Sequence, residues 1–225
     1  MKLKNAGDNK VKTQSLGEFG NILAMRPMGR KVQEALDTQL RQLPPGGVLV
    51  LDFSGVEMMD YSFADEALGT LYSRMSAKEY PDRFLILAVA DDELSEALME
   101  NVEVALSRRE VAALVLPRSA VPDVVAALQA AQAENGGQAP LSDAEERQHL
   151  EWRVVGGLPG HLVDTLSAIM DKYQVTVREL ADTLKIDSAT ACNNRVAKLY
   201  QLHLVRREAA IVPEGGRLYS YTAIV

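Results

Sequence analysis

Residues 48–71 read VLVLDFSGVEMMDYSFADEALGTL, and this stretch decides the fold of the first half of the chain. It begins with a short apolar run, which is typical of a strand buried on both faces of a sheet. After a turn, apolar residues recur every four positions from Phe63 to Met75, which predicts a helix with one buried face. Ser62, followed by Asp65 three residues later, is a capping pair at the predicted start of that helix.

The same pattern extends along residues 1–133 on both sides of this stretch. Apolar runs alternate with segments of helical periodicity, and the alternation predicts an α/β domain with a largely parallel sheet and flanking helices. The strands are predicted at residues 14–25, 47–53, 83–90 and 111–116. The helices are predicted at residues 28–40, 62–75, 91–107 and 121–133.

A linker is predicted after this domain. Residues 133–140 read AENGGQAP, where a Gly-Gly pair, a proline and small polar residues interrupt helical periodicity. Ser142 and Glu145 form a second capping pair, which predicts a short helix reaching about Trp152. The chain is therefore divided into a domain at 1–133, a linker with a short helix at 134–159 and a second domain at 160–225.

Residues 176–190, TVRELADTLKIDSAT, carry the strongest signal of the second domain. Apolar residues from Val177 to Leu184 have helical spacing, a turn of three to four residues follows, and Asp187 or Ser188 is placed to cap the next helix. This is the spacing of a helix-turn-helix, whose second helix is offered to the major groove of DNA.

The order of elements around this motif predicts a small α+β domain. Helices are predicted at residues 161–172, 176–184 and 188–200. They are followed by two β-rich segments, at 204–212 and 217–224, with a hairpin turn at 213–216 between them. Three helices followed by a two-stranded ribbon is the order of a winged helix.

The helix at 188–200 is predicted to have an inward and an outward face. Spacing places Ala189, Cys192, Val196 and Leu199 inward, with Cys192 as a buried thiol. Polar residues occupy the other side, where asparagine can read adenine and Arg or Lys can contact guanine or phosphate. The candidate DNA-binding residues are Ser188, Thr190, Asn193, Asn194, Arg195 and Lys198 on this helix, with Arg207 and Arg217 in the β-ribbon.

The charge distribution leaves two interpretations of this domain open. The chain has a net charge of −7, but residues 151–225 hold nine Lys and Arg against eight Asp and Glu, a net charge of +1. Residues 188–207 include four basic residues and no acidic one, which is a local cationic face that a phosphate backbone can attract. An ordinary solvated face, or a winged helix that binds protein, is the alternative.

Both halves resemble known families on the residues quoted above. Residues 160–225 resemble the winged helix-turn-helix domains of bacterial transcription regulators. Residues 48–71 resemble the STAS domain of anti-sigma-factor antagonists, and are closer still to an uncharacterised bacterial STAS-like branch, whose pattern D-F-x-G-V then S-F-A-D-E stands here at 52–56 and 62–66. That likeness extends over about residues 20–130, and it implies a mixed sheet with flanking helices that binds a protein partner or forms a dimer.

The resemblance also implies a candidate regulatory serine. In the antagonists, the serine that matches Ser62 is phosphorylated by a partner kinase, which switches partner binding off. A phosphate there would place nearly two negative charges beside Asp60, Asp65 and Glu66, so these four residues form the possible phosphoacceptor and partner surface. The antagonists usually have Ser-Gly or Thr-Gly where this chain has Ser62-Phe63, and simple N-capping by Ser62 is therefore the preferred interpretation.

Other function classes lack their motifs in this sequence. One cysteine excludes an internal disulfide and multi-thiolate metal sites, and the three histidines match no metal-ligand spacing. The sequence contains no phosphate-binding loop, dinucleotide fingerprint or nucleophile elbow, so we expect no catalytic residue, cofactor or metal. No apolar run approaches the roughly 20 residues of a membrane helix, and the N-terminus does not read as a signal peptide, which predicts a cytoplasmic protein without membrane contact.

Three functions remain. The first is a sequence-specific regulator that binds double-stranded DNA and uses its STAS-like domain to bind a partner or to form a homodimer. The second is a partner-switching adaptor in which both domains bind protein. The third is a sensor that holds a small ligand in the crevice at the carboxyl ends of the parallel strands.

Overall fold

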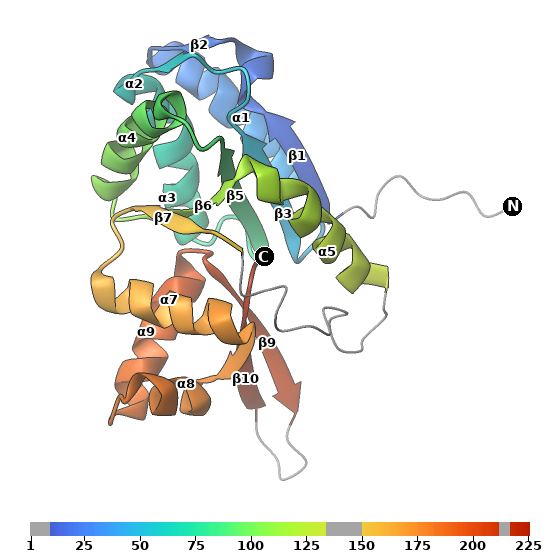
Figure 1. Cartoon of the computed structure of the whole chain (residues 1–225), viewed down its shortest axis with the longest axis vertical. Coiled ribbons are helices and arrows are strands. Elements are labelled where there is room, and N and C mark those ends of the chain that lie inside the picture. The colour runs from blue at the N-terminus through green and yellow to red at the C-terminus, as the bar shows by residue number, and fades with distance from the viewer. Residues whose placement is uncertain (1–9, 134–149, 212–216) are drawn as a thin grey trace, which may run out of the picture.

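A computed structural model describes residues 10–133, 150–211 and 217–225. The first of its two units is built on a five-stranded sheet in the order β1-β3-β5-β6-β7 (Figure 1). The first four strands are parallel, and β7 runs antiparallel to β6 at the edge. The strands are β1 (Val11–Ser15), β3 (Gly47–Asp52), β5 (Arg83–Val89), β6 (Ala112–Pro117) and β7 (Arg153–Gly156).

Helices cover both faces of this sheet, which explains why its central strands are continuous apolar runs. In β3, the residues from Val48 to Leu51 are at most 1% exposed. Helices α1 and α4 both contact the helical segment between β3 and β5, and α5 lies over the other face, where it contacts β1 (Figure 1). The main helices are α1 (Arg26–Gln42), α3 (Thr70–Ser76), α4 (Glu93–Ser107) and α5 (Val121–Ala133). The mixed α/β fold with a parallel-rich sheet agrees with the sequence prediction.

The helical segment between β3 and β5 contains an extra residue. It begins with α2 (Tyr61–Ala64), widens into a π-helical turn at Asp65–Gly69, and continues as α3. The backbone N–H of Thr70 donates to the carbonyl of Asp65, five residues earlier, which is the bond that defines a π turn. The sequence predicts one helix at 62–75. The structure instead has two α-helical pieces, and the π turn between them rotates their faces relative to each other.

The predicted strand at 14–25 is wrong in extent. Only Val11–Ser15 pairs in the main sheet, and a 3-10 turn (Leu16–Phe19) follows. This turn requires glycine at position 17, because a side-chain Cβ there would lie 2.3 Å from the carbonyl oxygen of Ser54. Further on, β2 (Ile22–Leu23) pairs in parallel with β4 (Met58–Met59) as a separate two-stranded sheet.

Part of the predicted linker belongs to the first unit. Residues 153–156 form the edge strand β7, with Val155 opposite Ala113 and Val154 opposite Leu114. The residues just before it, 150–152, are not helical, and the rest of the predicted short helix lies outside the described residues.

The second unit has three helices and a small antiparallel sheet in the order β8-β10-β9. The three predicted helices agree with the structure to within one residue at each end, whereas β8 was not predicted. The elements are α7 (Gly160–Lys172), β8 (Gln174–Thr176), α8 (Val177–Leu184), α9 (Ala189–Gln201), β9 (Val205–Ile211) and β10 (Arg217–Ala223). None of the helices within the described ranges is both long and apolar enough to cross a bilayer.

The two units pack against each other, and their buried apolar side chains form one continuous cluster. Three side chains at the end of α9 and the start of β9 donate hydrogen bonds to backbone carbonyls of the first unit. These are Gln201 Nε2 to Ser76 O (3.5 Å), His203 Nδ1 to Arg83 O (2.7 Å) and Arg206 Nη1 to Gly46 O (2.9 Å).

An aromatic contact completes this junction. The Arg206 guanidinium lies over the Phe84 ring, 4.8 Å from its centroid, and the His203 ring meets the same phenyl edge-on at 6.0 Å. Because a carbonyl oxygen can only accept, His203 Nδ1 carries the proton. Burial lowers the pKa of His203, so the ring is neutral at pH 7.

Candidate nucleic-acid interface and partner surface

Local sequence explains how α8 and α9 are formed and separated. Thr176 and Glu179 make a reciprocal capping box at the start of α8. Lys185 ends that helix in the left-handed conformation, at φ 53°, and Ser188 then caps α9 by accepting a hydrogen bond from the Ala191 N–H. The predicted helix, turn and cap are all present, with Ser188 and not Asp187 as the cap.

The faces of α9 agree with the prediction except at its first residue. Cys192, Val196 and Leu199 are fully buried, and burial raises the pKa of the Cys192 thiol. Ala189, which was expected to point inward, is exposed, because the turn before α9 leaves nothing to cover the first position of the helix.

The polar candidates on α9 form one accessible surface. Ser188, Thr190, Asn193 and Asn194 are exposed, and Arg195 and Lys198 are half-buried at its edge. The carboxyl end of α9 contacts the first unit through Gln201, so its amino end projects away from that unit (Figure 1). With a rise of about 1.5 Å per residue, the 13 residues of α9 place its amino end roughly 20 Å along the helix from the end that contacts the first unit.

The structure gives the basic residues of the ribbon different roles. Arg206, one of the four cations in residues 188–207, is used at the junction with the first unit and is withdrawn from the outer surface. Arg207 is exposed, and its guanidinium lies over the rings of Tyr200 and Tyr219, at 4.5 and 4.8 Å. The side chain of Arg217 lies outside the described residues. The local cationic face is therefore smaller than the sequence indicates.

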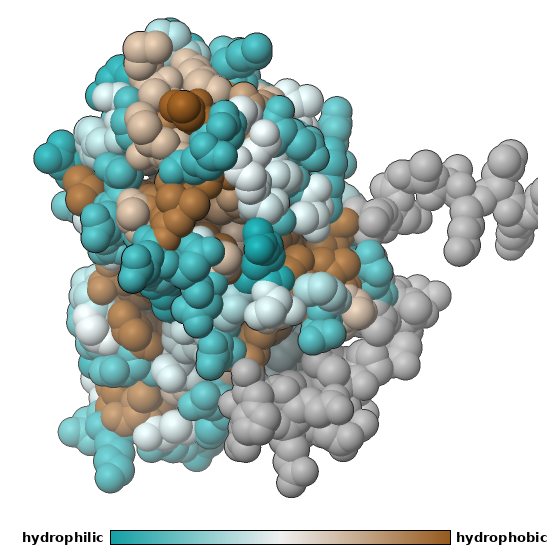
Figure 2. Space-filling view, turned by 45° about the horizontal axis from the view of Figure 1, so that its top comes forward, coloured by the Kyte–Doolittle hydropathy of each residue, from teal (hydrophilic) through white to brown (hydrophobic). Residues whose placement is uncertain are grey.

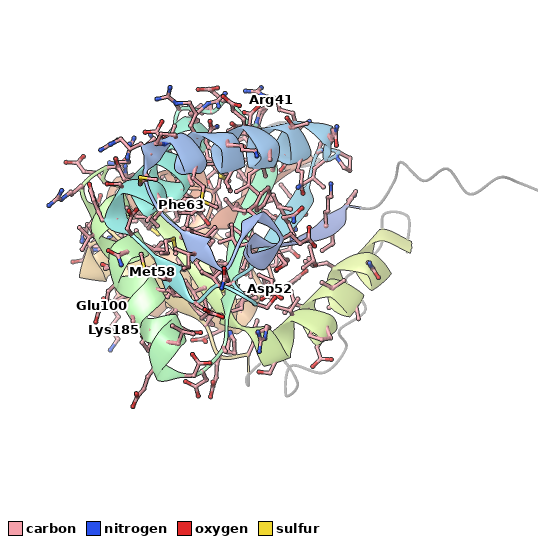
Figure 3. All side chains as sticks on the ribbon, turned by 90° about the horizontal axis from the view of Figure 1, so that it is seen from above. Arg41, Asp52, Met58, Phe63, Glu100 and Lys185 are labelled. Atoms are coloured by element: carbon pink, nitrogen blue, oxygen red, sulfur yellow. The ribbon has the colours of Figure 1, made fainter. Side chains whose placement is uncertain are left out.

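In the first unit, the turn after β3 is fixed by an aspartate. Asp52 accepts hydrogen bonds from the backbone N–H and the hydroxyl of Ser54, both at 2.9 Å. Such an Asx turn gives an aspartate at this strand end a structural role. Figure 3 looks onto this end of the unit, where Asp52, Met58 and Phe63 lie between α1 and α4.

The helix cap predicted at Ser62 is instead made by Asp60. Asp60 Oδ1 accepts from the Phe63 N–H at 2.7 Å, and Oδ2 accepts from the Met25 N–H at 3.0 Å. Ser62 is the second residue of α2 and is half-buried. The cap therefore lies two residues earlier than predicted, at a carboxylate that satisfies two backbone donors at once.

This correction changes the expected effect of mutation. Asp60→Ala is expected to lower the free energy of unfolding by about 1–2 kcal/mol, because it removes the cap of α2 and the acceptor for Met25. Ser62→Ala should change it by less than about 0.5 kcal/mol. Urea unfolding of the two variants measures the difference, and a larger loss for Ser62→Ala would restore Ser62 as the cap.

The two acidic residues after Phe63 are already neutralised by arginines. Asp65 is 6% exposed and contacts Arg109 Nε at 2.7 Å and Arg26 Nη1 at 3.2 Å. The hydrogen bond from Arg109 lowers the pKa of Asp65. Glu66 contacts Arg26 and Arg30, each at 3.2 Å. A phosphate on Ser62 would therefore meet a surface of mixed charge, where the sequence indicated a purely acidic one.

An exposed apolar patch lies beside Asp60, and it was not predicted from the sequence. Ile22, Met25 and Met58 are 53%, 66% and 48% exposed. Ile22 and Met58 are paired across β2 and β4, and Met25 N–H binds Asp60. Figure 2 shows an apolar area at the end of the molecule that carries β2. Only the pairing of two short strands far apart in sequence creates this patch, which is typical of a protein-contact surface.

Comparison with known proteins gives one informative match. No curated protein matches the chain. A solved structure described as that of the Aeropyrum pernix ORC1 protein in complex with DNA aligns with 96% of this chain and 75% of that chain, but at 11% identity and a TM-score of 0.28, which is too low to relate the two folds. Residues 29–93 match the family described as a STAS-like domain of unknown function (DUF4325), a range that includes most of α1 and all of β3, the π turn and β5. The chain therefore contains a STAS-like domain.

Proposed function

We propose that this chain is a sequence-specific DNA-binding transcriptional regulator whose STAS-like domain binds a protein partner or a second copy. The proposal assigns the chain to binding and not to catalysis. One observation carries it: the amino-terminal half of α9 exposes Thr190, Asn193 and Asn194 on the side opposite its buried face. Asparagine side chains on an exposed helix can make paired hydrogen bonds to adenine in the major groove.

The surroundings of α9 support this proposal. The order helix, strand, helix, helix and two strands is that of a winged helix, in which the second helix of the helix-turn-helix enters the groove with its amino-terminal residues. Arg195 and Lys198 stand beside the asparagines, where they can reach phosphates. Since the junction engages only the other end of α9, the proposed DNA surface stays open.

The test separates base contacts from phosphate contacts. Duplexes selected by the protein from a random library would be titrated by fluorescence anisotropy over a salt series. Asn194→Ala should cost about 1–3 kcal/mol on the selected site and little on random DNA. Lys198→Ala should weaken binding to both and reduce the slope of log K against log salt by about 1. Lys12→Ala removes the same charge from the exposed face of β1 and should change nothing.

Failure of that test would favour the second candidate, a partner-switching adaptor without DNA binding. Two observations favour it: the apolar patch Ile22, Met25 and Met58 is open, and Arg206 does not contribute to the surface of α9. If wild-type protein shows no saturable, salt-sensitive binding to any duplex, the adaptor replaces the regulator. Met25→Asp should then abolish self-association or partner capture without changing the melting temperature.

Phosphorylation of Ser62 remains a proposal within either function. Because Ser62 lies in the first turn of α2, a phosphate there would lie near the positive end of the helix, and we expect the fold to survive. Loss of partner binding by a folded Ser62→Asp variant would support the switch. Unchanged binding would leave Ser62 as an ordinary surface residue.

A further inference from the structure

A second candidate site lies at the carboxyl ends of β5 and β6. A pocket of about 220 Å³ opens where β5 and β6 end and β7 begins. The carboxyl ends of parallel strands are the usual place for ligands in such sheets. A pocket of this size, with an open mouth, can hold a small organic group.

The floor of the pocket is apolar and one wall is aromatic. Val89, Val115 and Leu116 supply buried aliphatic surface, and Pro117 lines the pocket beside them. Trp152, half-buried just before β7, is the only tryptophan of the chain. An indole face can bind an apolar chain or a cation.

The charges of the pocket are unbalanced. Arg153 forms a two-pronged ion pair with Glu96, with both N–O distances at 2.7 Å, so these two charges cancel. Asp91 and Glu151 also line the pocket, both are exposed, and neither forms an ion pair with the residues that the structure describes. The remaining charge therefore favours a positively charged guest and opposes an anionic one.

We propose that this pocket binds a small organic cation, with an ammonium or guanidinium group between Asp91 and Glu151 and a short apolar chain against Trp152. The ligand would contact the strand β7, which continues through three residues into α7 of the second unit. This binding does not depend on whether α9 binds DNA, so the two proposals can fail separately.

Trp152 makes the site directly observable, since the emission of the full-length protein comes from one indole. Hexylamine, protonated at pH 7, would be titrated against hexanol and hexanoate of matched length. We expect a saturable change of Trp152 emission with hexylamine alone, weakened by added salt. Equal responses to hexanol would show a merely apolar surface, a response to hexanoate would reverse the assigned charge, and no saturable response would remove the site.

Variants localise the effect. Asp91→Asn and Glu151→Gln should each weaken hexylamine binding about fivefold, as expected for loss of one partially exposed charge contact. Glu93→Gln removes the same charge from an exposed residue of α4 that does not line the pocket, and should leave binding unchanged. If all three variants weaken binding equally, the cation responds to overall charge and the pocket is not a site.

Discussion

Asp65→Asn is expected to lower the free energy of unfolding by about 2–3 kcal/mol at pH 7. The Asp65 carboxylate is buried between Arg109 and Arg26, and breaking a buried ion pair by removing one partner typically costs about 3–5 kcal/mol. We expect a loss below that range because the Arg109 side chain is 30% exposed and can turn toward water. Urea unfolding of wild type and variant measures the loss.

Glu66→Gln is the matched control on the neighbouring residue. Its partners, Arg26 and Arg30, are 55% and 68% exposed, so removal of this carboxylate should cost less than about 1 kcal/mol. Equal losses for the two variants would mean that burial of Asp65 does not govern the strength of its ion pairs.

At acid pH, the difference in free energy of unfolding between wild type and Asp65→Asn should disappear. Arg109 lowers the folded-state pKa of Asp65, whereas the unfolded carboxyl titrates near 3.9. The unfolded chain therefore binds the proton first, and the stability from Asp65 is full above the unfolded pKa and is lost as the pH falls through the folded pKa. If the two proteins differ in free energy of unfolding by the same amount at pH 7 and at a pH below the folded-state pKa, the stabilising role of the ionised Asp65 is contradicted.

Gly156→Ala should destabilise the protein by about 3 kcal/mol and free β7 from the sheet. Gly156 has a φ of +105°, and a Cβ there would lie 2.4 Å from the Val111 carbonyl oxygen and 2.8 Å from Leu106 Cβ. Backbone strain of this kind costs about 1–3 kcal/mol, and the clash with backbone atoms adds to it. Release of β7 should shift Trp152 emission toward that of solvent-exposed indole.

Gly160→Ala is the corresponding control, four residues later. A Cβ at Gly160 meets nothing within 4 Å, and the residue begins α7, so alanine should leave stability unchanged or raise it by less than about 1 kcal/mol. If Gly156→Ala leaves both the unfolding curve and Trp152 emission unchanged, β7 is not held as the structure indicates.

Features encoded by neighbouring residues were predictable from the sequence. The apolar runs of β3, β5 and β6 indicate buried strands because each is covered on both faces. Thr176 and Ser188 lie next to helices of clear periodicity, so α8 and α9 begin where the sequence places them. The outward face of α9 follows from the same periodicity.

Features decided by distant partners were not predictable. β7 and β8 are strands of four and three residues, too short for periodicity, and exist because β6 and β10 present free edges. Asp60 and Ser62 are both good caps, and only the contact of Asp60 with Met25 selects between them. Arg206 is a surface cation by sequence, and only its packing on Phe84 turns it inward. Gly69 at the end of the π turn likewise has a distant neighbour, since a Cβ there would lie 2.8 Å from Arg109 Nε.

At the junction between the two units, the side chains that donate hydrogen bonds all come from the second unit in the three bonds described above. These three hydrogen bonds between described residues cross the junction from side chains of residues 201–206 to main-chain oxygens of the first unit, and a main-chain oxygen is present whatever residue stands at that position. A change at Ser76 or Arg83 can therefore leave these acceptors in place, whereas a single change at His203 or Arg206 removes a donor. Gly46 is restricted by its φ of +77° and by Arg206 Nη1, which would lie 3.4 Å from an added Cβ. Over evolutionary time the first unit can vary at Ser76 and Arg83, provided that its backbone path, Gly46 and the Phe84 ring are kept. The second unit could be exchanged between STAS-like domains that share this backbone path and an aromatic ring at the position of Phe84.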